Sequence, residues 1–305
     1  TPDLTFESAA GGLTRDTSLS ELNGGSGVSR GKIVITDSLG VSQTIDLSRA
    51  GTVNEVLETI NGAAGLSVTA SVSDGRFVIR DDNGGTVSVA NAAGSTAATS
   101  LGIVGSGAGS LTGSVVYSIG ADTSLLSLND GNGVYISDTI GATRSDFRIV
   151  IDGSTTVSVN IGAKYDSASK LTEGAVSTVG GVITRINEAL AAAGFSDIAA
   201  SIGPDGSRLR IVDSQGTRTI DVAETGSGTT AKDLGLLATG ATGTVTGARI
   251  LAGMNGTLVR NINGGSGLGS DGAISFTLHD GSTFNLTLSA DTTIDGLISA
   301  IQSAS

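Results

Sequence analysis

The 305-residue chain contains no cysteine and no tryptophan, and only one histidine, one methionine and two prolines. Without cysteine, neither disulfide bonds nor thiolate metal sites can form. A single histidine also excludes a cluster of histidine ligands around a metal ion. Because aromatic residues make up only 3% of the chain, we expect cores built from small aliphatic side chains in thin, β-rich layers.

Positive charge is also scarce, with 17 Lys and Arg against 29 Asp and Glu and a net charge of -12. Binding to phosphates needs a basic stripe, so we expect no nucleic-acid partner. No stretch reaches the ~18 consecutive apolar residues of a membrane span, and we expect no membrane insertion. The chain begins with Thr1 instead of Met and ends inside a repeated segment, which indicates a piece of a longer protein.

One short motif occurs three times, as LNGGSGV, LNDGNGV and INGGSGL at residues 22–28, 128–134 and 262–268. We therefore predict three repeat units, at residues 1–108, 109–240 and 241–305, with the third truncated. The second unit is the longest, and a Ser/Gly-rich insertion near residues 164–181 is expected to form a surface loop or small flap. Gly/Ser/Thr-rich segments at residues 105–110 and 240–243 are predicted to be linkers.

Each repeat shows the same order of patterns. Apolar residues first alternate with polar ones on both sides of a turn, as at Ile274, Phe276 and Leu278 before Asp280-Gly281, which predicts a β-hairpin. A helix follows. In the first copy Thr52 and Glu55 fit a capping box. One apolar stripe then marks each helix, at Val53, Val56, Leu57 and Ile60; at Val179, Ile183, Ile186 and Leu190; and at Ile294, Leu297, Ile298 and Ile301 after a start at Thr292.

A second hairpin follows the helix in the first two copies, through Asp74-Gly75 and through Pro204-Asp205-Gly206. The predicted fold class is therefore α+β and β-rich, with repeated units of β-hairpin, short amphipathic helix and β-hairpin. Both copies close with a small apolar motif, SLGI at residues 100–103 and DLGL at residues 233–236.

The residues that could carry catalysis are few. His279 is the one histidine available to a Ser-His-Asp triad, but the other two copies carry different residues there, so we expect an exposed histidine at the end of a strand. The glycine run at residues 264–267 precedes a predicted strand instead of a helix N-terminus, which does not suit a phosphate loop. We predict no catalytic, cofactor-binding or metal-binding residue and no cofactor.

Calcium is the strongest alternative to that prediction. Residues 264–271 resemble a calcium nonapeptide, although Asp271 falls two places late. The turn at Asp81, Asp82, Asn83 and Gly84 offers two carboxylates and an amide oxygen, which are hard ligands of the kind that Ca²⁺ prefers. Paired carboxylates for glycoside hydrolysis also stay open, although the few aromatic residues do not indicate a sugar-binding platform.

The motif residues also carry a likeness to a known family. Residues 16–27 have the pattern D-T-S-L-x-x-L-N-G-G-S-G, and Ile-Asn pairs are present in the predicted helices at Ile60-Asn61 and Ile186-Asn187. This arrangement resembles the flagellin hook IN repeat of bacterial flagellins and hook-associated proteins. The resemblance covers most of residues 13–305, and the third copy departs from it by carrying Ile301-Gln302.

The resemblance implies a structural, non-catalytic, outward-facing domain of a flagellar hook-associated protein, at the hook–filament junction or the filament cap. Its implied location is extracellular, on the bacterial flagellum. Its implied partners are other axial subunits (hook, junction, flagellin or cap), with self-association as a further option. Sustained apolar heptads are absent from the sequence, so we expect the polymerising helices of such a protein to lie elsewhere. The alternative hypotheses are an adhesin-like extracellular binding module with calcium-stiffened loops and an enzyme acting on surface polysaccharide.

Overall fold

The computed structural model describes residues 16–137, 139–268, 273–277 and 281–304. The fold is α+β and β-rich, as predicted, with hairpins and short helices repeated along the chain. The chain divides into two compact units. Unit 1 comprises Thr1–Tyr117, Gly253–Ile262 and Leu268–Ser305, and unit 2 comprises Ser118–Ala252 and Asn263–Gly267. The bounds that the sequence suggests for three repeats stay a prediction.

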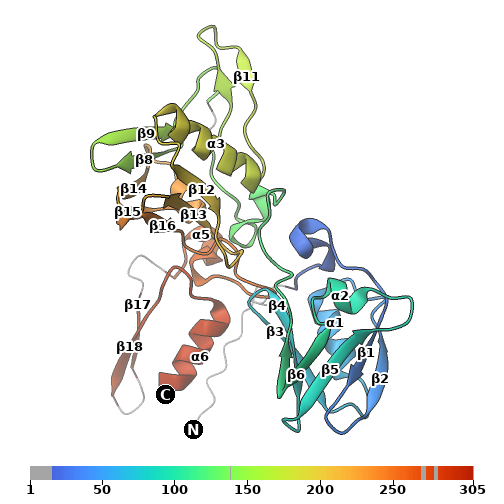
Figure 1. The fold of residues 1–305 in the computed structure, drawn as a ribbon. Helices are drawn as coiled ribbons and strands as arrows, with labels where there is room; N and C mark the ends of the chain where they lie inside the picture. Colours follow the sequence, from blue (N-terminus) through green and yellow to red (C-terminus); the bar gives the residue numbers. More distant parts are fainter. Residues whose placement is uncertain (1–15, 138, 269–272, 278–280, 305) are drawn as a thin grey trace. The chain divides into compact units, whose positions relative to one another are not determined.

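Residues 16–117 of unit 1 form two antiparallel sheets built on the two predicted hairpins of the first repeat (Figure 1). The first sheet has the order β2-β1-β5-β6, with β1 at Lys32–Thr36, β2 at Ser42–Asp46, β5 at Thr86–Asn91 and β6 at Gly105–Ala108. The second has the order β3-β4-β7, with β3 at Val68–Ser73, β4 at Arg76–Asp81 and β7 at Ser110–Thr112. The period-two pattern is confirmed, because Ile33 and Ile35 of β1 are both fully buried.

Unit 2 repeats this topology. Its first sheet has the order β9-β8-β14-β15, with β8 at Phe147–Ile151, β9 at Thr155–Val159, β14 at Thr219–Glu224 and β15 at Ala238–Thr242. Its second sheet has the order β12-β13-β16, with β12 at Ile198–Ile202, β13 at Leu209–Asp213 and β16 at Thr244–Thr246. The third strand of each first sheet, β5 or β14, was not predicted from the sequence.

The predicted helices form at α1 (Val53–Asn61) and α3 (Val179–Ala192), and they pack against β3 and β12. The capping box at α1 is present with one change. The Thr52 hydroxyl accepts a bond from the Glu55 N–H, while the Glu55 carboxylate accepts from Gly51 instead of Thr52. The apolar stripes are nearly as predicted. Leu57 and Ile183 are only half-buried, whereas Val182 and Arg185 lie on the buried side of α3.

The two segments predicted as linkers form strands instead, β6 with β7 and β15 with β16, and each pair of strands passes from the first sheet of its unit to the second. Their small residues serve close chain packing. A Cβ atom on Gly107 would lie 2.0 Å from the carbonyl oxygen of Ser110, so a larger residue could not occupy this position without moving the chain. Gly/Ser/Thr-rich composition therefore cannot distinguish a linker from a closely packed connection between two sheets.

The predicted insertion of unit 2 forms a small exposed hairpin, β10 (Lys164–Tyr165) and β11 (Leu171–Glu173), which extends from the sheets of this unit (Figure 1). Short helical turns complete the two units. They are η1 (Leu19–Glu21), η2 (Asn23–Gly25), α2 (Ala97–Ser100), η3 (Leu125–Ser127), η4 (Asn129–Gly131), α4 (Thr230–Asp233), η5 (Val259–Asn261) and α5 (Ile262–Gly265). Within the described residues, no helix is long and apolar enough to cross a membrane.

The third repeat provides a hairpin, β17 (Ala273–Thr277) and β18 (Thr283–Thr287), and helix α6 (Ile294–Ala304). The Phe276 and Phe284 rings stack across the hairpin with centroids 4.8 Å apart. Its turn at Asp280, and Leu278, lie outside the described residues. The Thr293 hydroxyl accepts from the Gly296 N–H, one residue later than the predicted start at Thr292. Helix α6 is less buried than predicted, because the Ile298 side chain is 39% exposed.

Candidate functional site

The repeated motif forms the same left-handed loop in all three copies. Its asparagines Asn23, Asn129 and Asn263 have φ angles of 53–54°, and the next two residues of each copy also have positive φ. Asparagine and glycine tolerate this region far better than other residues. The asparagine amide Nδ2 donates to the carbonyl oxygen four residues later at 2.9 Å in every copy, on Gly27, Gly133 and Gly267. The motif therefore specifies one backbone shape.

In the first two copies the same asparagine also joins the opening motif to the closing motif. The Asn23 amide Nδ2 donates to the Ser100 carbonyl at 2.9 Å, and the Asn129 amide Nδ2 donates to the Asp233 carbonyl at 2.7 Å. Their backbone N–H groups donate to Val116 and Ile250. One asparagine thus connects residues more than 70 positions apart in each copy, and we call this arrangement the asparagine fastener.

Each copy has an isolated β-bridge beside the loop, so the three copies share the same local structure there. The bridge joins the residue before the first helical turn to the threonine that precedes the repeat's helix. The three bridges are Ser18–Thr52, Ser124–Thr178 and Leu258–Thr293. Each copy therefore attaches the start of its helix directly to its opening motif.

In the acidic turn considered as a calcium site, the first carboxylate, that of Asp81, is hydrogen-bonded to other groups of the protein. Asp81 is 1% exposed. Its carboxylate accepts bonds from the Ser38 N–H and hydroxyl and from the N–H groups of Asn83 and Gly85. The backbone bond from Ser38 is the main cause of its lowered pKa, against the opposing effect of burial. Asp82 accepts a bond from the Thr69 hydroxyl. These donors are hydrogen-bonded to the carboxylate oxygens of Asp81 that a cation would need as ligands.

Asp213 occupies the matching end of β13 in unit 2, but it has a charged partner. Its carboxylate accepts from the N–H groups of Gln215, Thr217 and Arg218, and Arg218 Nη1 lies 3.1 Å from it. The backbone bond from Arg218 is the first cause of its lowered pKa. The Arg218 guanidinium also pairs with Asp197 at 2.5 Å and lies over the Phe195 ring. Hydrogen bonding to Asp197 raises the pKa of Arg218.

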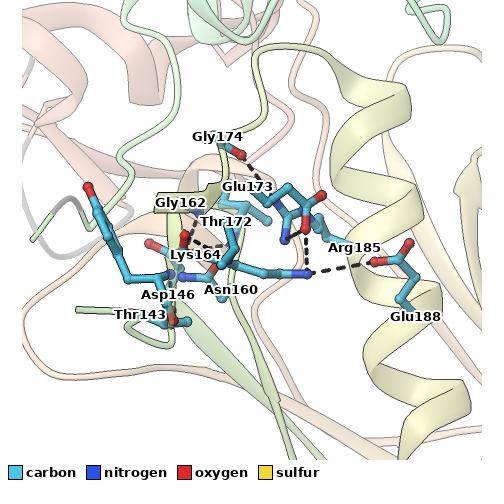
Figure 2. A network of polar contacts seen from close by, with 12 residues as sticks. Thr143, Asp146, Asn160, Gly162, Lys164, Thr172, Glu173, Gly174, Arg185 and Glu188 are labelled. Atoms are coloured by element: carbon cyan, nitrogen blue, oxygen red, sulfur yellow. Dashed lines mark hydrogen bonds and ion pairs between the residues drawn. The ribbon is translucent and has the colours of Figure 1, made fainter. Parts of the chain in front are cut away.

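A polar network fixes the exposed hairpin of unit 2 to α3 (Figure 2). The Arg185 side chain is buried on α3, and its Nη2 atom donates to the Gly174 carbonyl at 3.0 Å. Its Nη1 atom lies 3.0 Å from the Glu173 carboxylate but has no hydrogen-bond partner among the described residues, so this contact is electrostatic. Burial lowers the pKa of Arg185. Lys164 completes the network by pairing with Glu173 at 3.0 Å and with Glu188 at 3.9 Å.

The remaining sequence candidates do not form a reactive site within the described residues. His279 and Asp271 lie outside those residues. Residues 264–267 form part of the third left-handed loop, and the strand β17 follows them instead of a long helix. Among the described residues, no group of three or more His, Asp or Glu side chains could hold a metal ion. The asparagine fastener, the carboxylate-bound turns and the Arg185 network are thus the principal polar arrangements of the two units.

Comparison of the chain with protein-family models, with curated proteins and with solved structures gives no match.

Proposed function

We propose that this chain is a structural, outward-facing segment of a bacterial flagellar hook-associated protein, from the hook–filament junction or the filament cap. The observation that carries the proposal is the motif at residues 22–28, 128–134 and 262–268, which folds into the same loop each time. The resemblance of residues 16–27 and of the Ile-Asn pairs to the IN repeat connects this unit to flagellar axial proteins.

The use of polar groups supports a non-catalytic role. Asn129 and Asp81 are buried and bonded to backbone groups, and Asp213 is bonded to backbone groups and to an arginine. Groups used in this way stabilise a fold and are not placed to act on a ligand. A repeat fastened by backbone bonds is suited to adding bulk to the exterior of a filament.

The proposed partners are other axial subunits, including hook, junction, flagellin or cap proteins, and further copies of this chain. The proposed location is outside the cell, on the flagellum. The net charge of -12 supports such an exposed position, because like charge keeps neighbouring surfaces soluble.

Immunogold electron microscopy with antibodies against this chain tests the proposal on intact bacteria that encode it. We expect gold at the hook–filament junction or at the filament tip, and none on a strain that lacks the gene. An in-frame deletion of residues 16–252 should remove the signal of antibodies raised against residues 16–252, and antibodies against the rest of the parent protein should still label the flagellum. Gold spread over the cell body, or flagella that neither contain nor require the parent protein, would contradict the assignment.

Calcium titration by calorimetry separates this proposal from the adhesin-like alternative. A flagellar segment with its turn carboxylates already bonded should give no heat with Ca²⁺ and no change in melting temperature. Binding heat together with a higher melting temperature would favour the adhesin.

A further inference from the structure

Units 1 and 2 contain the same three contact positions, but different parts of the chain bind to them. In unit 2 these positions are the turn residue Gly206, the motif residue Thr123 and the first-turn helix residue Gly180. In unit 1 the matching positions are Asp74, Thr17 and Asn54. We call this set of contact positions the leader socket.

Two backbone hydrogen bonds in each unit establish that these positions match. The Val116 and Tyr117 N–H groups donate to the Gly75 carbonyl, and the Ile250 and Leu251 N–H groups donate to the Ser207 carbonyl. Gly75 and Ser207 are therefore equivalent. The residues before them, Asp74 and Gly206, are equivalent as well.

In unit 2 the socket holds the residues immediately before its own motif. The Ile119 N–H donates to the Gly206 carbonyl at 2.8 Å, and the Gly120 N–H donates to the Thr123 hydroxyl at 2.8 Å. The Thr123 N–H donates back to the Gly120 carbonyl, and the Gly180 N–H donates to the Ala121 carbonyl. A leader segment of three residues thus meets the turn, the threonine and the helix.

In unit 1 a segment from the start of the third repeat makes the matching contacts. The Met254 N–H donates to the Asp74 carbonyl at 2.7 Å, as the Ile119 N–H does to Gly206. The Asn255 N–H donates to the Thr17 hydroxyl at 3.0 Å, as the Gly120 N–H does to Thr123. Thr17 and Asn255 are 238 positions apart, so sequence adjacency is not needed to fill the socket.

The Asn255 side chain makes contacts at two positions where the unit 2 leader uses its backbone, although the contact with the helix runs in the opposite direction. Its Oδ1 atom accepts from the Thr17 N–H at 2.9 Å, which replaces the carbonyl of Gly120. Its Nδ2 atom donates to Asn54 Oδ1 at 2.7 Å, at the helix position where Gly180 contacts the leader in unit 2. Asn255 has a φ of 56°, which asparagine and glycine tolerate.

We propose that the leader socket of unit 1 is a peptide-docking site whose occupant is residues 253–256, and that Asn255 is its specificity-determining residue. The partner it fits is the leader segment of another repeat, with an apolar residue followed by asparagine and glycine. Docking attaches the start of the third repeat to the first repeat, and Met254 is 4% exposed in the socket. This inference is independent of the flagellar assignment.

Amide hydrogen exchange of the whole chain with the substitution Asn255→Gly tests the proposal. Glycine keeps the positive φ and the N–H group, and removes only the two side-chain bonds. Exchange of the Thr17 and Met254 amides should accelerate roughly tenfold, the effect of losing about one net hydrogen bond. The matched control Asn263→Gly removes an asparagine with a φ of 53° outside the socket and should leave both amides unchanged.

The variant Asn54→Ala gives a second reading that does not alter the docked segment. Alone it should accelerate exchange of the same amides by a smaller factor, and added to Asn255→Gly it should change them less than about twofold, because both substitutions remove the same bond. Unchanged exchange in both single variants, or fully multiplicative effects, would overturn the proposal. Protection in the unaltered chain should not depend on protein concentration. A loss of protection on dilution would assign the docked segment to a second copy and overturn the intramolecular form.

Discussion

Units 1 and 2 share one strand topology but place different chemistry at the same position. Ile35 of β1 pairs with Val89, as Ile149 of β8 pairs with Val222. The residue two positions further along is Asp37 in unit 1 and Ile151 in unit 2, and both are buried. The pairing of the strands therefore fixes which side chains point into the core. Nearby hydrogen-bond donors determine whether such a side chain can be polar.

Those donors are present around Asp37. Its carboxylate accepts bonds from the N–H groups of Leu39, Val41 and Ser67. At Ile151 the turn is tighter, and the Ser154 N–H donates to the Ile151 carbonyl. The ends of β4 and β13 differ in the same manner, because Ser38 binds Asp81 whereas Arg218 binds Asp213. At equivalent buried positions the repeat therefore accepts an apolar side chain, or a carboxylate with neutral or charged donors. Each buried polar group needs a hydrogen-bond or ion-pair partner.

The largest expected effect comes from moving the unit 1 residue into unit 2. The substitution Ile151→Asp buries a carboxylate where the side chain is now apolar and 1% exposed. We expect the free energy of unfolding to fall by about 3–5 kcal/mol at pH 7, as for an uncompensated buried charge. Urea unfolding followed by circular dichroism measures the loss. The control Ile151→Val should cost about 1 kcal/mol, and equal losses for both would refute the role assigned to the donors.

The next effect compares the two asparagine fasteners. Asn129 is 4% exposed, whereas Asn23 is exposed. Replacement by glycine preserves the positive φ and leaves two carbonyl groups without the amide. We expect Asn129→Gly to lower the free energy of unfolding by about 2 kcal/mol and Asn23→Gly by about 1 kcal/mol, because water can reach the exposed site. Urea unfolding of the two variants side by side gives the difference. A greater loss for Asn23→Gly would contradict the burial argument.

Acid should affect both turn aspartates, but salt should distinguish them. Because the pKa of Asp81 and of Asp213 is lowered in the folded chain, their contribution is present above the unfolded pKa of about 4 and is lost as pH falls through the folded value. Unfolding measured from pH 7 to pH 2 should lose part of this acid dependence in Asp81→Asn and in Asp213→Asn. In about 1 M NaCl, only the Asp213 contribution should shrink, since Arg218 is a charged partner. If salt changed the Asp81 and Asp213 contributions equally, the ion pair between Asp213 and Arg218 would not account for the stability that Asp213 provides.

The smallest effect is expected in the exposed hairpin of unit 2. The Glu173 side chain is 51% exposed although it pairs with Lys164 and Arg185. We expect Glu173→Gln to lower the free energy of unfolding by about 0.5 kcal/mol, as solvent screens the pair. Glu188→Gln is the matched control and should have almost no effect, because its contact with Lys164 is 3.9 Å long. Thermal unfolding at low and high salt measures both.

The sequence predicted what depends on local pattern. Alternating residues such as Ile33 and Ile35 identified the hairpins, and Thr52 with Glu55 identified the start of α1. The repeated asparagine and glycine residues identified the three repeats. Their long-range partners could not be predicted, because the acceptors on Ser100 and Asp233 are backbone carbonyls that any residue provides.

Two side chains show a further limit of pattern analysis. Arg185 lies on the buried side of α3, where an arginine would ordinarily be assigned to the solvent face. Its position depends on an insertion that brings Glu173 and Gly174 beside the helix. Asp81 was considered as a calcium ligand because the sequence does not show that Ser38, which lies in another hairpin, donates to its carboxylate. Contacts between elements, and not the residue types, decided both cases.

Hydrogen exchange of the Asn23 and Asn129 amides measures whether one repeated loop fastens both complete repeats. These N–H groups donate to the carbonyls of Val116 and Ile250. We expect both amides to exchange as slowly as those of the central strands β1 and β8. Exchange of either amide as fast as in the exposed hairpin at residues 164–173 would contradict it.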